Sequence, residues 1–227
     1  YFKYSNNGIN LIASIIENLQ QTPYYKIVEE FYQDFGLRTT QMDSDDKMIQ
    51  RRVTQYKPVY SPDGSFHYQP APVTDNLKPY PHWAAEGAIS TVEDLLQFSQ
   101  NILDITRGRY NYISNKTLND MWNWTTEIGK NVTSMTIDGI KIDNIKTNYV
   151  MGWQRFDFPE VQGLPNISKL KMLFHTGMME SASAIMAIFP EKLFAISAIA
   201  NLGGLSDKFP EMAVNSFQIL YNPNQND

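Results

Sequence analysis

Two short stretches, far apart in the chain, carry residue types that catalyse acyl transfer. Tyr4-Ser5-Asn6 lies near the first residue, and His175-Thr176-Gly177 lies in the last quarter of the 227 residues. A tyrosine accepts the proton of a serine hydroxyl only when nearby cations lower its pKa from about 10. Tyr4 is therefore a candidate base. The amide of Asn6, which both donates and accepts hydrogen bonds, is a candidate for positioning a substrate carbonyl.

The second stretch would complement the first. An imidazole is mostly neutral at pH 7, so His175 can hydrogen-bond to Tyr4 or to a leaving group but cannot supply a permanent cation. Thr176 offers a hydroxyl to the substrate, and Gly177 lets a strand backbone approach it because glycine has no Cβ. Considered alone, Tyr4 could simply be a packing residue. Considered alone, His175 could simply be a polar residue whose hydrogen bonds are satisfied within the protein. The ordered pair favours catalysis.

Helices are predicted along most of the first 148 residues. Apolar residues recur at helical spacing after the first motif, so residues 1–7 are expected to form a loop and 8–20 an amphipathic helix. Ser90 stands three residues before Glu93, a capping box that begins a helix whose apolar stripe runs to residue 103. Capping and turn residues predict further helices at 23–35 and 114–122.

Turn residues interrupt this helical part twice. Residues 53–82 hold six of the twelve prolines, and the turn sequence SPDGS between two alternating stretches predicts a hairpin and an extended loop. Asp138-Gly139 predicts a second, small hairpin.

The chain becomes rich in strand-forming residues from 149 on. Strands are predicted at 149–156, 170–175, 182–189 and 194–201, and a helix at 208–221. Consecutive strands on short connections imply an antiparallel sheet with a helix packed on it. The expected fold class is α+β, with a helical lobe at 1–148 and a sheet lobe at 149–227 in one composite domain.

The order and spacing of these motifs resemble the serine β-lactamase and penicillin-binding protein superfamily. The residues concerned are the two motifs and, between them, WAAEGAISTVEDLLQF at 83–98. Within the superfamily, FKYSNNGINLIASIIE, WAAEGAISTVEDLLQF and HTGMMESASAIMAIFPE are similar to its mitochondrial serine β-lactamase-like members. The resemblance covers nearly the whole chain. It implies a β-lactamase/transpeptidase-like fold, a serine hydrolase acting through an acyl-enzyme on esters, amides or peptides, no cofactor, and a mitochondrial location.

The resemblance also assigns roles to individual residues. His175 stands where many members carry the lysine of K-T-G, which fits uncharged acyl substrates better than β-lactams. The backbone N–H of Met178 would be one oxyanion donor. Glu86 stands where the family prefers glycine. It is either an exposed loop acid or a side chain that narrows the cleft and disfavours anionic substrates.

In the superfamily the nucleophilic serine and its lysine, S-x-x-K, precede the Y-x-N loop by several tens of residues. We therefore expect this chain to be the C-terminal portion of a larger protein, with the upstream segment as its partner and a sheet edge left exposed. Two S-x-x-K strings do occur, at 44–47 in an acidic polar segment and at 168–171 running into a strand. Neither presents serine and lysine together at a helix start, so neither is expected to be the nucleophile.

Composition excludes several other functions. A formal charge of −5 argues against nucleic-acid binding, and no apolar run approaches the ~20 residues of a membrane span. The chain has no cysteine, and its three histidines, among them His67 and His82, lack the spacing of a metal site. Sequons that would permit glycosylation, and so leave secretion open as an alternative location, occur at Asn115, Asn123, Asn131 and Asn166.

Two other functions remain open at the level of sequence. A catalytically vestigial β-lactamase-like protein could serve as a self-associating scaffold, forming homo-oligomers or filaments. An ordinary binding domain would lack an organised cleft between Tyr4 and His175. An intact S-x-x-K upstream favours the enzyme, and its loss favours the scaffold.

Overall fold

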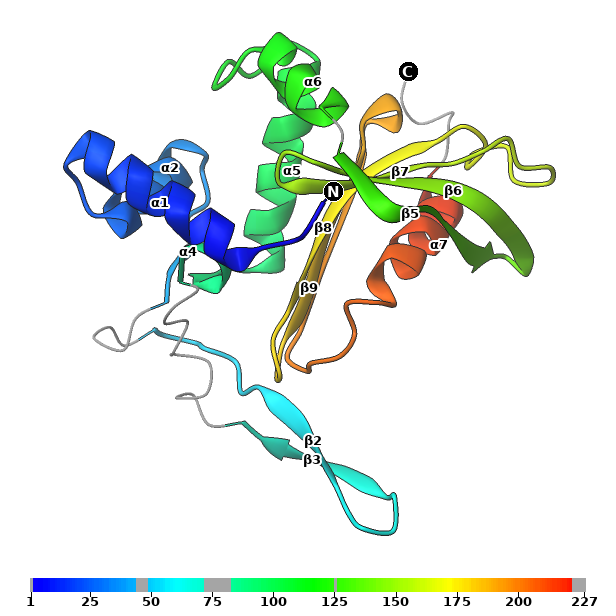
Figure 1. The fold of residues 1–227 in the computed structure, drawn as a ribbon, viewed down its shortest axis with the longest axis horizontal. Coiled ribbons are helices and arrows are strands. Elements are labelled where there is room, and N and C mark those ends of the chain that lie inside the picture. Colours follow the sequence, from blue (N-terminus) through cyan, green and yellow to red (C-terminus); the bar gives the residue numbers. More distant parts are fainter. Residues whose placement is uncertain (1, 44–48, 72–82, 125, 222–227) are drawn as a thin grey trace.

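The computed structural model describes residues 2–43, 49–71, 83–124 and 126–221. The described residues form an α+β fold in which a curled antiparallel sheet lies between one helix and a group of helices (Figure 1). The string at 44–47 and His82 lie outside the described residues. No helix within these ranges has the length and apolar composition needed to cross a bilayer.

The central sheet has six strands in the spatial order β10-β9-β8-β7-β6-β5, each antiparallel to its neighbours. Strands that follow one another in sequence are adjacent, which confirms the antiparallel sheet predicted from the short connections. The strands are β5 (Thr126–Ile137), β6 (Ile140–Val150), β7 (Trp153–Asp157), β8 (Lys171–Met178), β9 (Ser183–Phe189) and β10 (Phe194–Ala200); the 3₁₀ turn η1 (Pro190–Lys192) joins the last two.

Two sequence-based predictions about this sheet were wrong. The strand predicted at 149–156 is two strands, because Met151 and Gly152 form a turn between β6 and β7 in which Gly152 has φ +77°. The hairpin at Asp138-Gly139 is present, but its strands, β5 and β6, are long and belong to the six-stranded sheet. The division of the chain into lobes at residue 148 stays a prediction.

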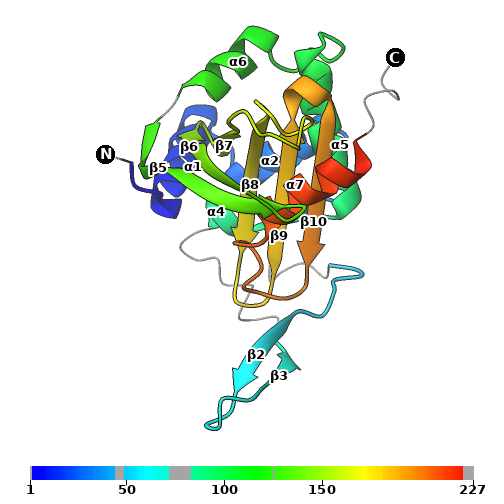
Figure 2. The same ribbon diagram turned by 90° about the vertical axis from the view of Figure 1, so that its right-hand side faces the viewer.

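Helix α7 (Phe209–Leu220) covers one face of the sheet, as Figure 2 shows. Its residue Phe217 is fully buried and stacks on Phe189 of β9 with ring centroids 4.5 Å apart. Ile137 of β5 and Ile142 of β6 belong to the same buried cluster. The curled sheet therefore encloses α7, so that the first and last strands contribute to one core.

The opposite face packs against helices α2 (Tyr24–Asp34), α5 (Val92–Thr106) and α6 (Asn115–Asn123). Leu173 of β8 is buried in this second cluster, whereas the next residue, Phe174, is buried in the α7 cluster. Successive side chains of a strand point to opposite faces, so a single strand supplies both cores. The three helices predicted for this part of the chain are confirmed.

The starts of two helices differ from the predictions. Helix α1 (Asn6–Gln20) begins two residues early because the Ser5 side chain caps it, accepting a hydrogen bond from Gly8 N at 3.1 Å. In α5 the cap is Thr91, not Ser90: the Thr91 hydroxyl accepts from Asp94 N at 3.3 Å. Ser90 instead lies 2.8 Å from the Thr40 hydroxyl.

The apolar stripe predicted for α1 is exposed in the described part of the chain. Leu19 is 78% exposed, and Ile12 and Ile15 are each about half exposed. Ala13 is the one residue of this helix that is buried.

The remaining elements are short. Helix α4 (Trp83–Glu86) leads into β4 (Ala88–Ile89), which pairs with β1 (Gln41–Met42). The hairpin predicted around SPDGS is confirmed as β2 (Tyr56–Tyr60) and β3 (Phe66–Pro70), and it projects away from the rest of the molecule in both views (Figures 1 and 2).

Candidate functional site

A cleft of about 680 Å³ lies between the start of α1, the α4 turn and the C-terminal end of β8. All the residues that the sequence singled out for the site line it: Tyr4, Asn6, Glu86, His175, Thr176, Gly177 and Met178. Residues separated by more than 160 positions thus meet around one space, because the helical part of the chain packs against the sheet. The sequence-based hypothesis of an ordinary binding domain expected no cleft between Tyr4 and His175, whereas the described residues form one.

The N-terminus of α1 positions the first motif. Ser5 is extended (φ −151°) and caps the helix, so Tyr4 stands just before the helix and Asn6 lies in its first turn. The Nδ2 of Asn6 donates a hydrogen bond to the Glu86 carboxylate. The Oδ1 of Asn6 is buried and has no hydrogen-bond partner among the described residues. An acceptor thus remains available at the cleft for a donor from a substrate or another segment.

A tight turn after α4 presents Glu86. Gly87 N donates to Trp83 O at 2.7 Å, and a Cβ at Gly87 would lie only 2.3 Å from Trp83 Cδ1. Only glycine fits under the indole, so the turn directly after Glu86 is closely packed against Trp83.

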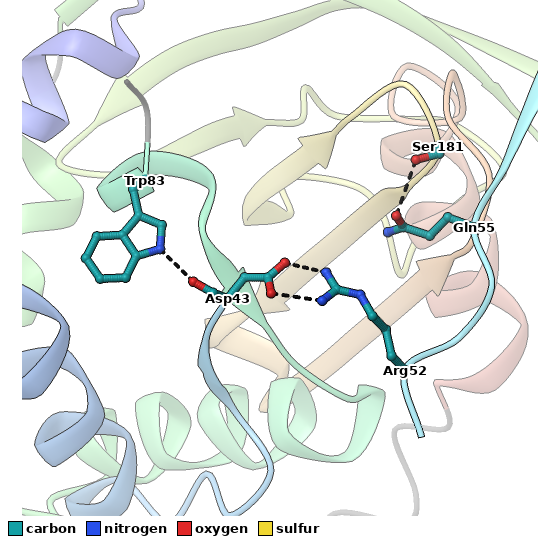
Figure 3. Close-up of polar contacts among 5 residues, drawn as sticks. All are labelled: Asp43, Arg52, Gln55, Trp83 and Ser181. Carbon is teal, nitrogen blue, oxygen red and sulfur yellow. Dashed lines mark hydrogen bonds and ion pairs between the residues drawn. The ribbon is translucent and has the colours of Figure 1, made fainter. Parts of the chain in front are cut away.

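Polar contacts connect this turn to the loop between β8 and β9, as Figure 3 shows. Asp43 N donates to Gly87 O at 2.6 Å, and Trp83 Nε1 donates to Asp43 O at 2.9 Å. Both guanidinium NH groups of Arg52 bind the largely buried Asp43 carboxylate.

These polar contacts continue to the sheet. The Ser181 hydroxyl, in the turn after β8, donates to Gln55 Oε1 at 3.3 Å, and Tyr56 N donates to Asn201 O at 2.9 Å. Residues 52–56, named here the strap, therefore connect the Glu86 turn to the end of the sheet.

The end of β8 forms the other wall. β7 pairs with β8 only as far as Phe174, whereas β9 pairs with it through Met178. On the β7 side, the last four residues of β8 thus have no strand partner in the described part of the chain. The strand predicted to end at His175 extends to Met178, so the whole second motif lies on this open edge.

The surroundings of His175 orient its imidazole and favour the neutral form. Its Nδ1 is 2.9 Å from the carbonyl oxygen of Thr176, which can only accept, so Nδ1 carries the proton. Its Nε2 lies 3.4 Å from the Tyr149 hydroxyl. Burial lowers the pKa of His175, and the hydrogen bond to Thr176 opposes this only in part. The neutral state expected from the sequence is thereby favoured.

Tyr4 lies beside His175, with ring centroids 6.0 Å apart. Burial first, and then the charge of Glu86, raise the pKa of Tyr4. A base role needs the opposite shift. Among the described residues that line the cleft, Glu86 is the one charged side chain, so a cation that would lower the pKa of Tyr4 must come from elsewhere.

Sequence reasoning missed several residues that organise the site. The strand pattern identifies Tyr149 only as a strand residue, and the motifs do not include Asp43 or Arg52 or give Phe2 a role. Tyr149 contacts His175, 26 residues away, and Phe2, 147 residues away. The contact between Asp43 and Arg52 depends on how loop residues pack. No local pattern marks them.

The second S-x-x-K string is not arranged as a nucleophile. Ser168 lies before β8 and accepts a hydrogen bond from Val161 N at 3.1 Å. Lys171 lies in β8, 3.4 Å from the Glu191 carboxylate. Neither lines the cleft. Nor do the described residues bring three His, Asp or Glu side chains together as a metal site would require.

Comparison with known sequences agrees with this geometry. The family model described as Beta-lactamase matches residues 1–220. The serine beta-lactamase-like protein LACTB, mitochondrial, of Mus musculus is 25% identical over 202 residues, which cover 85% of this chain and 33% of the relative. The chain thus spans about a third of the length of that curated relative.

Solved structures show the same fold. A penicillin-binding protein from Bacillus halodurans superposes with a TM-score of 0.65 at 16% identity, covering 97% of this chain and 56% of that one. A D-amino acid amidase from Ochrobactrum anthropi, solved with L-phenylalanine amide, gives a TM-score of 0.64 at 19% identity, covering 96% and 57%.

Proposed function

The chain belongs to the beta-lactamase family, and from this premise we propose that it forms the downstream part of a serine hydrolase that cleaves neutral esters, amides or peptides through an acyl-enzyme. The family supports a hydrolase of the serine type. The mechanism and the substrates are proposals. A mitochondrial location is also a proposal, and it comes from the name of the mouse relative. The observation that carries the proposed mechanism is the meeting of Tyr4, Asn6 and His175 in one cleft.

The roles follow from the chemistry of these groups. A serine hydroxyl, with its S-x-x-K lysine, is proposed to enter the cleft from outside residues 1–227. It attacks the acyl carbonyl and gives its proton to Tyr4, whose pKa the lysine ammonium would lower. Collapse of the tetrahedral intermediate returns this proton to the leaving group. Water then hydrolyses the acyl-serine bond, with Tyr4 again as base.

Asn6 and the end of β8 would hold the substrate. The unpartnered Oδ1 of Asn6 suits a donor on the substrate or the lysine. The Met178 N–H is proposed as one oxyanion donor, and the open edge of β8 supports this role because a substrate can lie along it. Thr176 and Gly177 would contact the substrate from the same edge.

Charge in the cleft favours uncharged substrates. A penicillin carries a carboxylate, which a fixed cation would bind with a charge-assisted hydrogen bond of about 1.5–3 kcal/mol. Here burial keeps His175 neutral, and Glu86 adds a negative charge at the cleft. The absence of this cation alone should weaken binding of the penicillin transition state roughly ten- to a hundredfold.

The test compares two substrate classes on the full-length protein. We expect a higher kcat/KM for a neutral p-nitrophenyl ester or a blocked peptide amide than for a penicillin. His175→Lys should shift the ratio toward the penicillin, and Glu86→Gly should shift it the same way. His67→Lys, on the exposed strand β3, adds the same charge far from the cleft and should leave the ratio unchanged.

Efficient hydrolysis of penicillin by the unmodified protein would refute the substrate assignment. The scaffold alternative predicts something different: no hydrolysis of either class and no labelling by a serine-reactive phosphonate. Labelling at an upstream S-x-x-K serine would exclude a vestigial site.

A further inference from the structure

Tyr149 contacts both Tyr4 and His175, the two aromatic residues proposed to act in the site. Its ring contacts Tyr4 edge-on, with centroids 5.9 Å apart, and His175 edge-on, with centroids 6.1 Å apart. On another side Phe2 stacks on it at 4.8 Å. Tyr149 lies on β6, two strands away from His175 in the sheet. It therefore joins the segment that carries Tyr4 to the strand that carries His175.

The hydrogen-bond roles follow from the partners of the imidazole. Since Nδ1 must donate to the Thr176 carbonyl, the neutral ring leaves Nε2 as an acceptor. The group facing Nε2 is the Tyr149 hydroxyl, at 3.4 Å. Burial, and then Tyr4, raise the pKa of Tyr149 to about 12, so its hydroxyl keeps its proton at neutral pH. Tyr149 is thus the donor and His175 the acceptor.

We propose that Tyr149 is a positioning residue that holds His175 in one orientation and one tautomer while its ring docks the Phe2–Tyr4 segment onto the sheet. The catalytic part of this proposal rests on the proposed function. With a partner on each ring nitrogen, His175 can neither flip nor turn its Nε2 toward Tyr4 without losing a hydrogen bond.

The two roles of Tyr149 reside in different parts of its side chain and can be separated. Tyr149→Phe keeps the ring that contacts Phe2 and Tyr4 and removes only the hydroxyl. Phe2→Leu keeps the hydroxyl and removes the ring stacked on Tyr149. The hydroxyl should govern the imidazole, and the ring contact should govern the placement of Tyr4.

The first measurement does not depend on activity. Long-range ¹H–¹⁵N NMR spectra of the full-length protein at pH 8 report which imidazole nitrogen carries the proton, with His175→Gln identifying the signals. The unmodified protein should show His175 protonated at Nδ1. In Tyr149→Phe the Nε2 signal should move downfield, toward that of a nitrogen without a donor. In Tyr60→Phe, the same change on the projecting hairpin, it should not move.

The second measurement is steady-state hydrolysis of the neutral ester. Loss of the hydrogen bond that fixes the His175 ring beside Tyr4 should lower kcat of Tyr149→Phe about three- to tenfold, with KM changed less than about twofold. Phe2→Leu should lower kcat without moving the Nε2 signal. Tyr60→Phe should match the unmodified protein.

Three results would overturn the proposal. Protonation at Nε2 in the unmodified protein would show that Tyr149 is not the donor and His175 not the acceptor. This test needs only the unmodified protein, so it can be made even if no variant folds. An unmoved Nε2 signal in Tyr149→Phe would show that the hydroxyl does not donate. A moved signal with unchanged kcat would show that the bond does not position His175 for catalysis. Failure of the proposed function itself differs from all three, since the unmodified protein would then hydrolyse no ester while the NMR result stands.

Discussion

At the scale of single residues, the site combines a tyrosine and a histidine whose environments favour their neutral forms. Burial raises the pKa of Tyr4 and lowers that of His175. Both shifts arise because desolvation penalises the charged form of each group. The described residues therefore form a wall of uncharged hydrogen-bonding groups beside one carboxylate, Glu86. In the proposed mechanism, a lysine from outside this set supplies the positive charge that would lower the pKa of Tyr4.

The lowered pKa of His175 predicts a pH dependence of stability. The unfolded state binds a proton on this residue below about pH 6.5, whereas the folded state binds it only at lower pH. The folded state should therefore lose stability as the pH falls below about 6.5. His175→Gln should lack this component. Urea unfolding of both proteins between pH 5 and 8 measures the difference, with His67→Gln as the exposed control. Parallel curves for His175→Gln and the unmodified protein would contradict the shift.

At the scale of elements, the cleft depends on a loop as much as on helices and strands. The turn after Glu86 is held by the packing of Gly87 against Trp83 and by the hydrogen bonds of Asp43 to Gly87 and Trp83. Arg52 binds Asp43, and the strap that begins at Arg52 runs to the sheet (Figure 3). A polar connection thus joins the Glu86 turn to the end of the sheet, in addition to the packing of α5 on the sheet.

The ion pair at the start of the strap should be energetically coupled. Asp43 is 7% exposed, and its carboxylate faces both guanidinium NH groups of Arg52. In a double-mutant cycle with Asp43→Asn and Arg52→Met, we expect a coupling free energy of about 1–3 kcal/mol from urea unfolding. Arg107→Met, at an exposed position after α5, should not couple to Asp43→Asn. Additive effects of the two changes in the pair would contradict this.

At the scale of the whole molecule, the sheet is stabilised from both faces. α7 lies in the curl of the sheet, and α5 lies on the opposite face. The cleft lies at the C-terminal end of β8. The exposed hydrophobic side chains of α1 contrast with these two cores. The part of the molecule that carries His175 is therefore more extensively packed than the helix that follows Tyr4.

The core around α7 should dominate stability. Phe217→Ala removes a fully buried ring stacked on Phe189, which should cost about 3–5 kcal/mol of unfolding free energy. Leu220→Ala, three residues later on the same helix but 63% exposed, should cost less than about 0.5 kcal/mol. Urea unfolding measures both. Similar losses for the two variants would show that α7 does not pack as the structure describes.

The sequence by itself determined several of the helices and strands and the identity of the motifs. Helical spacing, strand alternation and turn residues are local properties, and they predicted α2, α6, α7, β9 and β10 to within about one or two residues. The motifs around Tyr4, Glu86 and His175 predicted the superfamily, which the family match confirms. Where local reasoning was wrong, a competing local interaction explains it. The Ser5 cap extended α1, and a two-residue turn at Met151-Gly152 divided one predicted strand.

Only the tertiary structure decided how the site is assembled. The contact of Tyr149 with His175, the pairing of Asp43 with Arg52 and the contact of Asn6 with Glu86 join residues 9 to 80 positions apart. The chain folds to bury its two cores, and these contacts follow from that packing. The pKa shifts of Tyr4 and His175 arise from the same burial. Desolvation depends on what surrounds a group in space, and no local pattern of residues specifies it.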